Sequence, residues 1–262
     1  CRGNGVWRYD PASQRAKRFL PGEYNGRLQM DRHGTVWLIN RGTLFKHDRT
    51  KDAMVEVWKM PQQRGETKEL SHIFIDSSGT FWLGGNSILV NLMPDLKTYS
   101  VFLHDPRDTT SLPSGWIGNA VQDRDGNMWF AALGGVYRFE KATRSFTRFH
   151  HNDQDTTTLS TDTYTLLYVD RGGTLWVATI DGLNRFNESN STFTRYYVSD
   201  PRILFRGVGP IQEDAKGNFW YFSGWWMTKF EPSTGRFTVF DRSDGLEEIA
   251  ILGSHTRLRS GE

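Results

Sequence analysis

The motif Asp-x-x-Gly-x-x-Trp occurs five times in this chain of 262 residues and constrains its fold more than any other feature. The copies begin at Asp31, Asp76, Asp123, Asp170 and Asp214 and end at Trp37, Trp82, Trp129, Trp176 and Trp220. Successive tryptophans are separated by 45, 47, 47 and 44 residues. A motif that recurs at such a period indicates an array of similar structural units.

Turn residues and the alternation of apolar and polar side chains divide each unit into four short segments. In the third copy, strands are predicted at 116–122, 128–132, 136–140 and 146–150. The fourth copy repeats nearly the same strand and turn lengths, and no apolar stripe at helical spacing is sustained in any copy. The sequence therefore predicts an all-β fold, a β-propeller of four-stranded antiparallel blades.

We expect residues 1–262 to form one β-propeller segment with five complete blades and two partial ones. The complete blades are expected at approximately 21–60, 70–103, 116–150, 164–198 and 208–241, and the partial blades at 1–20 and 250–262. Because exposed strand edges invite aggregation, the two partial blades are expected either to meet or to be completed by further sequence.

The repeated residues have structural explanations. The turn Asp is expected to accept hydrogen bonds from backbone N–H groups two or three residues on, and the Gly to supply a positive φ. The Trp is expected to fill the wedge between adjacent blades. A calcium loop at Asp123, Asp125 and Asn127 is the alternative, but the position of Asp125 is His33, Ser78, Gly172 or Lys216 in the other copies. Because the other copies do not keep the carboxylate of Asp125, the repeat does not preserve a calcium ligand set, which argues against a metal site.

Composition excludes several classes of function. The 32 basic and 30 acidic residues are spread along the chain, so a nucleic-acid partner is not expected. No apolar stretch is long enough for a membrane helix, so no membrane contact by this segment is expected. The single cysteine, Cys1, permits no internal disulfide and no CxxC motif.

Catalytic motifs are not found. The sequence contains no GxSxG elbow, no HExxH motif and no Gly-rich phosphate loop. The seven histidines fall at turns or strand ends without an evident common spacing. We therefore predict no catalytic residues, no metal site and no cofactor.

Candidate ligand-binding residues are those that depart from the repeat. In a four-stranded meander, the fourth-to-first connections and second-to-third turns share one face, which carries the variable loops. Trp116 stands where the fourth copy has Thr163, and Trp225 and Trp226 replace small turn residues. These tryptophans are candidate stacking platforms for sugar rings. Their candidate polar neighbours are Arg206, Arg41, Asn86 and Asp181. The structural alternative is that the tryptophans close gaps between blades or contact a neighbouring domain.

Two long segments carry a resemblance to a known family. They are "HDPRDTTSLPSGWIGNAVQDRDGNMWFAALGGVYRFEKATRSFTRF" and "HNDQDTTTLSTDTYTLLYVDRGGTLWVATIDGLNRFNESNSTFTRY". Their Asp…Ser-Leu or Thr-Leu loop, Gly-x-x-Trp strand, Gly-x-x-Arg-Phe strand and Phe-Thr-Arg ending resemble the two-component regulator propeller repeat. The first two blades match less well, because "INRGTLFKHD" and "GGNSILVNLMPDL" lack the Arg-Phe pair.

The resemblance implies a periplasmic sensor region of a membrane-spanning hybrid histidine kinase, and many such regions respond to glycan breakdown products. It implies kinase modules outside these residues, so the segment itself is not expected to be an enzyme. Expected partners are an oligosaccharide or another small ligand, neighbouring propeller or sandwich domains of the same receptor, and a second copy of the chain. Two alternatives stay open: a streptogramin-lyase-like propeller enzyme and a non-catalytic scaffold for protein interactions.

Overall fold

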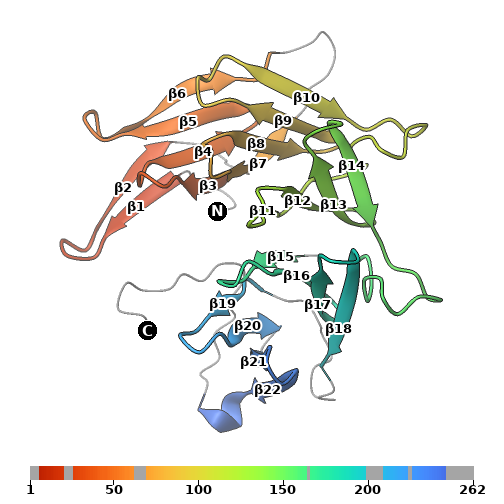
Figure 1. Ribbon diagram of the computed structural model, residues 1–262. Coiled ribbons are helices and arrows are strands. Elements are labelled where there is room, and N and C mark those ends of the chain that lie inside the picture. Colours follow the sequence, from red (N-terminus) through yellow and green to blue (C-terminus); the bar gives the residue numbers. More distant parts are fainter. Residues whose placement is uncertain are drawn as a thin grey trace. The chain divides into compact units, whose positions relative to one another are not determined.

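The computed structural model describes residues 6–20, 26–61, 69–163, 166–198, 209–223 and 226–245 (Figure 1). Within these ranges the chain forms 22 β-strands and one 3-10 helix of three residues. The predicted all-β class is confirmed. In the part of the chain that the structure describes, no helix has the length and apolar character needed to cross a membrane.

The chain divides into two compact units, Cys1–Gly118 (unit 1) and Asn119–Glu262 (unit 2). The strands of unit 1 are β1 (Val6–Asp10), β2 (Arg15–Leu20), β3 (Arg27–Met30), β4 (Val36–Asn40), β5 (Thr43–Asp48), β6 (Ala53–Lys59), β7 (Leu70–Ile75), β8 (Phe81–Gly85), β9 (Ile88–Leu92) and β10 (Tyr99–Leu103).

The elements of unit 2 are β11 (Ala120–Gln122), β12 (Met128–Ala132), β13 (Gly135–Glu140), β14 (Ser145–Phe149), β15 (Leu166–Val169), β16 (Leu175–Thr179), β17 (Gly182–Asn187), β18 (Thr192–Tyr197), β19 (Gln212–Glu213), β20 (Phe219–Ser223), β21 (Trp226–Glu231), β22 (Arg236–Phe240) and the helix Arg242–Asp244.

The strands pair in chain order as antiparallel meanders, as expected for propeller blades. Five sheets have four strands each: blade 1 (β3–β6), blade 2 (β7–β10), blade 3 (β11–β14), blade 4 (β15–β18) and blade 5 (β19–β22). β1 and β2 form a two-stranded sheet, as predicted for a partial blade. The second predicted partial blade, 250–262, lies outside the described residues. That all 262 residues form one propeller segment stays a prediction.

The first strand of blade 3 is shorter than predicted. β11 begins at Ala120, whereas the sequence suggested a strand from Trp116. Trp116 and Ile117 bond instead to the β8–β9 turn of blade 2: Trp116 forms a β-bridge with Asn86, and Ile117 N donates to Gly85 O at 3.0 Å. These two residues therefore bond to a neighbouring hairpin instead of extending the strand. A local sequence pattern contains no information about such a contact.

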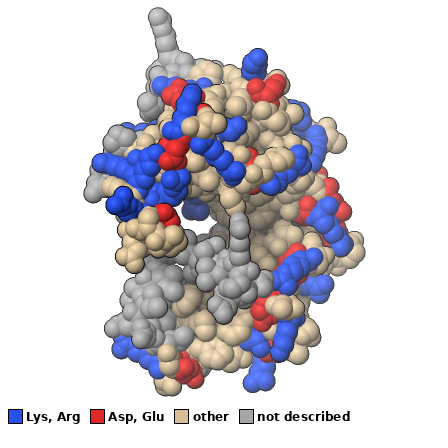
Figure 2. All heavy atoms as spheres, turned by 90° about the vertical axis from the view of Figure 1, so that its left-hand side faces the viewer, with Lys and Arg blue, Asp and Glu red and all other residues tan. Residues whose placement is uncertain are grey.

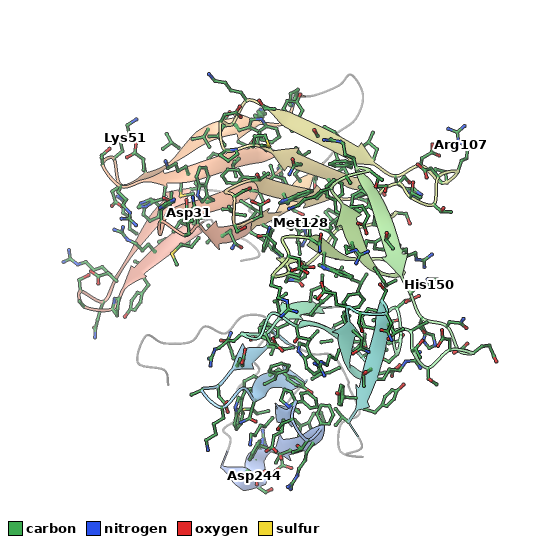
Figure 3. The ribbon with its side chains drawn as sticks, viewed as in Figure 1. Asp31, Lys51, Arg107, Met128, His150 and Asp244 are labelled. Atoms are coloured by element: carbon green, nitrogen blue, oxygen red, sulfur yellow. The ribbon has the colours of Figure 1, made fainter. Side chains whose placement is uncertain are left out.

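The five Asp-x-x-Gly-x-x-Trp turns share two backbone bonds: the Gly N–H donates to the Asp carbonyl, and the Asp N–H donates to the carbonyl four residues on. Asp31 marks the first turn in Figure 3. Its Oδ1 accepts from the backbone N–H groups of His33 and Thr35, both at 2.9 Å. In four of the turns the donors therefore lie two and four residues on, rather than two or three, and at Asp170 the described donor lies four residues on. The turn glycines all have φ between 74° and 86°, as predicted.

Each turn Asp also holds the Trp of its own motif, which the sequence analysis did not foresee. In all five copies the indole Nε1 donates to Asp Oδ2 at 2.8 to 3.0 Å. The rings of Trp37 and Trp129 also pack against the next blade, with ring centroids 4.7 Å from Phe81 and 4.8 Å from Phe186. The predicted wedge role is confirmed for these two tryptophans.

Candidate functional site

The two kinds of connection lie on opposite sides of unit 1. Figure 3 shows Asp31, in the β3–β4 turn, and Lys51, in the β5–β6 turn, on one side, and Arg107, in the β10–β11 connection, on the other. We call the side with Asp31 the turn face and the side with Arg107 the loop face. This separation follows from the meander, because alternate connections of antiparallel strands come at opposite ends.

Trp116 lies on the loop face of unit 1, on a backbone segment that is fixed in place. Ser87 N donates to Gly115 O at 2.7 Å, and Gly115 N donates to Ser87 Oγ at 2.9 Å. The Trp116 side chain is nevertheless 49% exposed. A large ring held on an immobilised backbone provides contact area at little entropic cost.

The structure brings two of the predicted site residues together. Asn86 is exposed and forms a β-bridge with Trp116. The imidazole of His72, on β7, lies 6.3 Å from the Trp116 ring. Burial, reinforced by the charge of Arg27, lowers the pKa of His72 to about 4, so this imidazole is neutral at physiological pH. The cluster offers an aromatic face, an amide and a neutral imidazole, which suit an uncharged, hydroxyl-rich ligand.

The remaining predicted residues are not part of this cluster. Arg41 is exposed in the β4–β5 turn of blade 1, where its φ is 48°, and it has no hydrogen bond or ring contact with Trp116. Asp181 and Trp226 belong to unit 2 and are both half-buried. Arg206 and Trp225 lie outside the described residues. Whether any of these residues binds a ligand stays a prediction.

Asp181 adjoins a buried polar cluster that the sequence analysis missed. The backbone N–H of Asp181 donates to Thr179 Oγ1 at 3.2 Å, and Thr179 bonds to Ser160 at 2.9 Å. Asn184 completes the cluster: its Oδ1 accepts from Ser160 N and its Nδ2 donates to Val177 O. The bonds of Ser160 tie the 151–163 connection to blade 4, so the cluster has a structural role.

Two histidines have related structural roles, and the expectation that the histidines share no spacing is wrong for this pair. His104 and His151 are 47 residues apart, the same interval as between Trp82 and Trp129. Nδ1 of each ring bonds to a leucine carbonyl eight residues on, at 2.9 Å for His104 and 2.6 Å for His151. Each ring thereby closes a loop of the form His-x-x-x-Asp-Thr-Thr-Ser/Thr-Leu.

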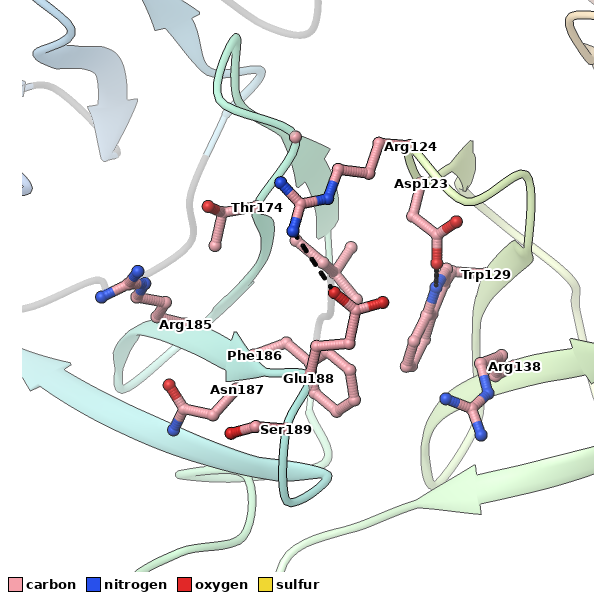
Figure 4. A pocket seen from close by; sticks show the side chains of 12 residues that line it. Asp123, Arg124, Trp129, Arg138, Thr174, Arg185, Phe186, Asn187, Glu188 and Ser189 are labelled. Carbon is pink, nitrogen blue, oxygen red and sulfur yellow. Dashed lines mark hydrogen bonds and ion pairs between the residues drawn. The ribbon is translucent and has the colours of Figure 1, made fainter.

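Grooves between successive blades open beside the Asp-x-x-Gly-x-x-Trp turns, whose repeated residues were expected to have only structural roles. In unit 2, a groove of about 240 Å³ lies between blades 3 and 4 (Figure 4). Glu188 enters this groove from the β17–β18 turn and forms an ion pair with Arg124 at 3.6 Å. In unit 1, the equivalent groove between blades 1 and 2 is larger, about 520 Å³. Among the described residues, no cluster of three or more His, Cys, Asp or Glu side chains could hold a metal ion.

Comparison with protein families identifies a repeat in this chain. Residues 111–134, which include Trp116 and the third Asp-x-x-Gly-x-x-Trp turn, match the family model described as two component regulator propeller. None of the curated proteins matches the chain.

Solved structures with similar folds are β-propellers. The extracellular domain of a B. thetaiotaomicron protein, described as a hybrid two-component system, is similar with a TM-score of 0.63 and 19% identity over 80% of this chain. Virginiamycin B lyase from Staphylococcus aureus is similar with a TM-score of 0.61 and 14% identity over 82% of this chain.

The lengths of the compared proteins differ from that of this chain. It spans 29% of the B. thetaiotaomicron domain and 68% of the lyase. At such low identities the likeness shows the fold alone, which confirms the propeller prediction. The family match confirms the resemblance found in the sequence: this chain carries a two-component regulator propeller repeat within a fold of β-propeller blades.

Proposed function

We propose that this chain is a ligand-sensing propeller in the extracellular region of a two-component receptor, and that it recognises a glycan-derived oligosaccharide. The observation that carries the ligand proposal is Trp116, an exposed ring on a segment bonded to a neighbouring hairpin. The family repeat at 111–134 and the likeness to an extracellular domain of a two-component system support the sensor role.

The ligand would bind on the loop face of unit 1. An apolar sugar face would stack on the Trp116 ring, and Asn86 would exchange hydrogen bonds with sugar hydroxyls. His72 would contribute a neutral ring nitrogen at the edge of the same surface. Binding would signal by favouring one arrangement of the receptor over another, which requires a difference in affinity between the two.

The test is oligosaccharide binding by the intact chain and by two tryptophan variants. We expect thermal-shift screening of an oligosaccharide array to find a ligand, and Trp116→Ala to weaken its affinity roughly tenfold, equivalent to about 1.4 kcal/mol. The matched control is Trp7→Ala, because Trp7 is 53% exposed in the same unit but lies on β1. No binding by a folded chain across the array, or equal losses in both variants, would contradict the proposal.

A lyase is the second candidate, since virginiamycin B lyase has a similar fold. Four of the described histidines have rings that bond within the chain: His33 to Arg32, His47 to Asp52, and His104 and His151 to their loops. His72 has a pKa lowered to about 4 by burial, which makes it a weak base. We therefore expect no ring opening when a streptogramin B is incubated with the chain. Turnover that is lost on replacing a single His would favour the enzyme instead.

A further inference from the structure

We propose that the groove between blades 1 and 2 binds a small organic carboxylate with an apolar body. This groove, here called the blade 1–2 groove, lies on the turn face, at the opposite end of β8 from Trp116. Its volume of about 520 Å³ falls in the range of small-molecule sites. The proposal concerns a second site, separate from the proposed oligosaccharide surface.

The groove offers an apolar wall to the body of a ligand. Its floor is formed by Trp37 and Phe81, which are buried and packed edge to face. Met30, on β3, is 64% exposed and lines the groove. The half-buried residues Val57, Ile75 and Leu96 pack against the same core and complete the wall. A ligand ring placed here would remove exposed methionine surface from water.

Lys46 supplies a positive charge that no described carboxylate neutralises. Its Nζ lies 5.5 Å from the centre of the Trp37 ring, its only described polar or ring contact. The cations at the same strand position in blades 3 and 5 are both paired: Arg138 with Glu140 at 2.7 Å and Lys229 with Glu231 at 2.6 Å.

Blade 1 lacks this pairing because its third strand ends in a shorter acid. Asp48 occupies the position of Glu140 and Glu231. Its Oδ1 accepts from Thr50 N, Thr50 Oγ1 and Lys51 N, and its Oδ2 lies 3.9 Å from Lys51 Nζ. The Asp48 carboxylate therefore bonds within the β5–β6 turn and does not pair with Lys46. The ammonium group of Lys46 remains available to an anion.

The other acids of the groove are also occupied. Asp31 accepts from two backbone N–H groups and the Trp37 indole, and Asp76 accepts from Ser78, Thr80 and Trp82. Arg32 adds a second cation at the rim, where it donates to Ser77 O at 3.1 Å. Figure 2 shows Lys and Arg side chains gathered on this side of unit 1. The two cations balance the charges of Asp31 and Asp76 in the groove, and the ammonium group of Lys46 is the donor that remains available to an anion.

The equivalent groove of unit 2 supplies its own carboxylate. Glu188 of blade 4 corresponds to Pro94 of blade 2. Each lies three residues after the strand residue that pairs with the motif Trp of its own blade. Its carboxylate enters the groove and pairs with Arg124, the counterpart of Arg32 (Figure 4). In the blade 1–2 groove Pro94 leaves this place open, and the groove has about twice the volume. The ligand would contribute the carboxylate that the chain provides in unit 2.

The experiment compares a carboxylate with its neutral analogue. Cyclohexanecarboxylate and cyclohexanemethanol would be titrated into the full chain, and the indole N–H resonance of Trp37 and the methyl resonance of Met30 would be followed by NMR. We expect saturable shifts with the carboxylate and at least tenfold weaker binding of the alcohol. Equal affinities, or no saturable shift with the carboxylate, would overturn the proposal.

Three variants locate the site. Lys46→Gln should weaken carboxylate binding about tenfold, and Pro94→Glu should abolish it by placing the unit 2 carboxylate in the groove. Lys229→Gln is the matched control, because Lys229 also lies over a motif Trp, at 6.0 Å, but is paired with Glu231. Its affinity should equal that of the unmodified chain. Binding that persists in both Lys46→Gln and Pro94→Glu would place the carboxylate elsewhere.

Discussion

At the scale of single residues, the turn aspartate links the local turn to the core. Asp214 accepts from Lys216 N and Asn218 N through Oδ1, and from Asn218 Nδ2 and Trp220 Nε1 through Oδ2. Burial opposes ionisation of this carboxyl, but the hydrogen bonds outweigh it and hold its pKa well below the usual range. One carboxylate thus fixes the turn and the orientation of the motif Trp.

Replacing this carboxylate by an amide should destabilise unit 2. In Asp214→Asn, an amide NH₂ would face either the Asn218 and Trp220 donors or the backbone donors, and one set would lose its acceptor. We expect a loss of about 2 kcal/mol in the free energy of unfolding, measured by urea denaturation. Asp95→Asn is the control, because Asp95 is exposed and bonds only within its own turn. Equal effects of the two substitutions would contradict the role given to the indole bond.

At the scale of elements, the β1–β2 hairpin is attached to blade 1 by packing of Phe19 against His47, with ring centroids 5.2 Å apart. The ionic part of this attachment depends on one acid. Asp52, in the β5–β6 turn, accepts from Arg8 at 2.9 Å, Lys17 at 2.6 Å and His47 at 3.2 Å. The hydrogen bond from Lys17 and the other contacts lower the pKa of Asp52 to about 2 despite desolvation. Because the pKa is lower in the folded state, this ionic attachment is complete above pH 4 and is lost as the pH falls towards 2.

The attachment can be tested through amide hydrogen exchange in β1 and β2. In Asp52→Asn, we expect faster exchange in these strands at pH 6, with little change in β7–β10. Asn tolerates the positive φ of 44° at this position, so the substitution removes charge without backbone strain. In the unmodified chain, exchange relative to the intrinsic rate should rise between pH 4 and pH 2. Unchanged protection of β1 and β2 in the variant would show that packing alone holds the hairpin.

At the scale of the whole molecule, each unit is built by packing between successive blades. Phe186 of blade 4 contacts Trp129 and Phe149 of blade 3, with ring centroids 4.8 Å and 5.4 Å away. Arginines that follow the turn Asp add bonds to the next blade: Arg124 donates to Gly172 O at 3.5 Å and Arg171 to Asp214 O at 2.9 Å. These contacts make adjacent blades dependent on one another.

Truncation of Phe186 should therefore destabilise more than one blade. We expect Phe186→Ala to lower the free energy of unfolding by about 3 to 5 kcal/mol, because it opens a cavity between two sheets. Phe186→Leu, which retains most of the volume, should lose less than about 1.5 kcal/mol. Urea unfolding gives the energies, and hydrogen exchange in β11–β14 shows whether blade 3 loosens with blade 4. Loosening confined to β15–β18 would argue against blade coupling.

The sequence by itself determined the features that recur at a fixed period. Turn chemistry and strand alternation are local, so five copies of one motif were sufficient to predict the antiparallel blades and the wedge role of the motif Trp. The family resemblance rested on the same repeated residues. Single departures from the repeat, such as Trp116, marked candidate site residues without indicating their neighbours.

Only the tertiary structure decided which separated residues meet. It placed Trp116 against the turn of the preceding blade, bonded each motif indole to its turn Asp, and gave Lys46 no carboxylate partner among the described residues. It also formed grooves beside the repeated turns, whose residues were expected to have only structural roles. These features depend on side-chain direction and on contacts between blades, and a one-dimensional pattern contains neither.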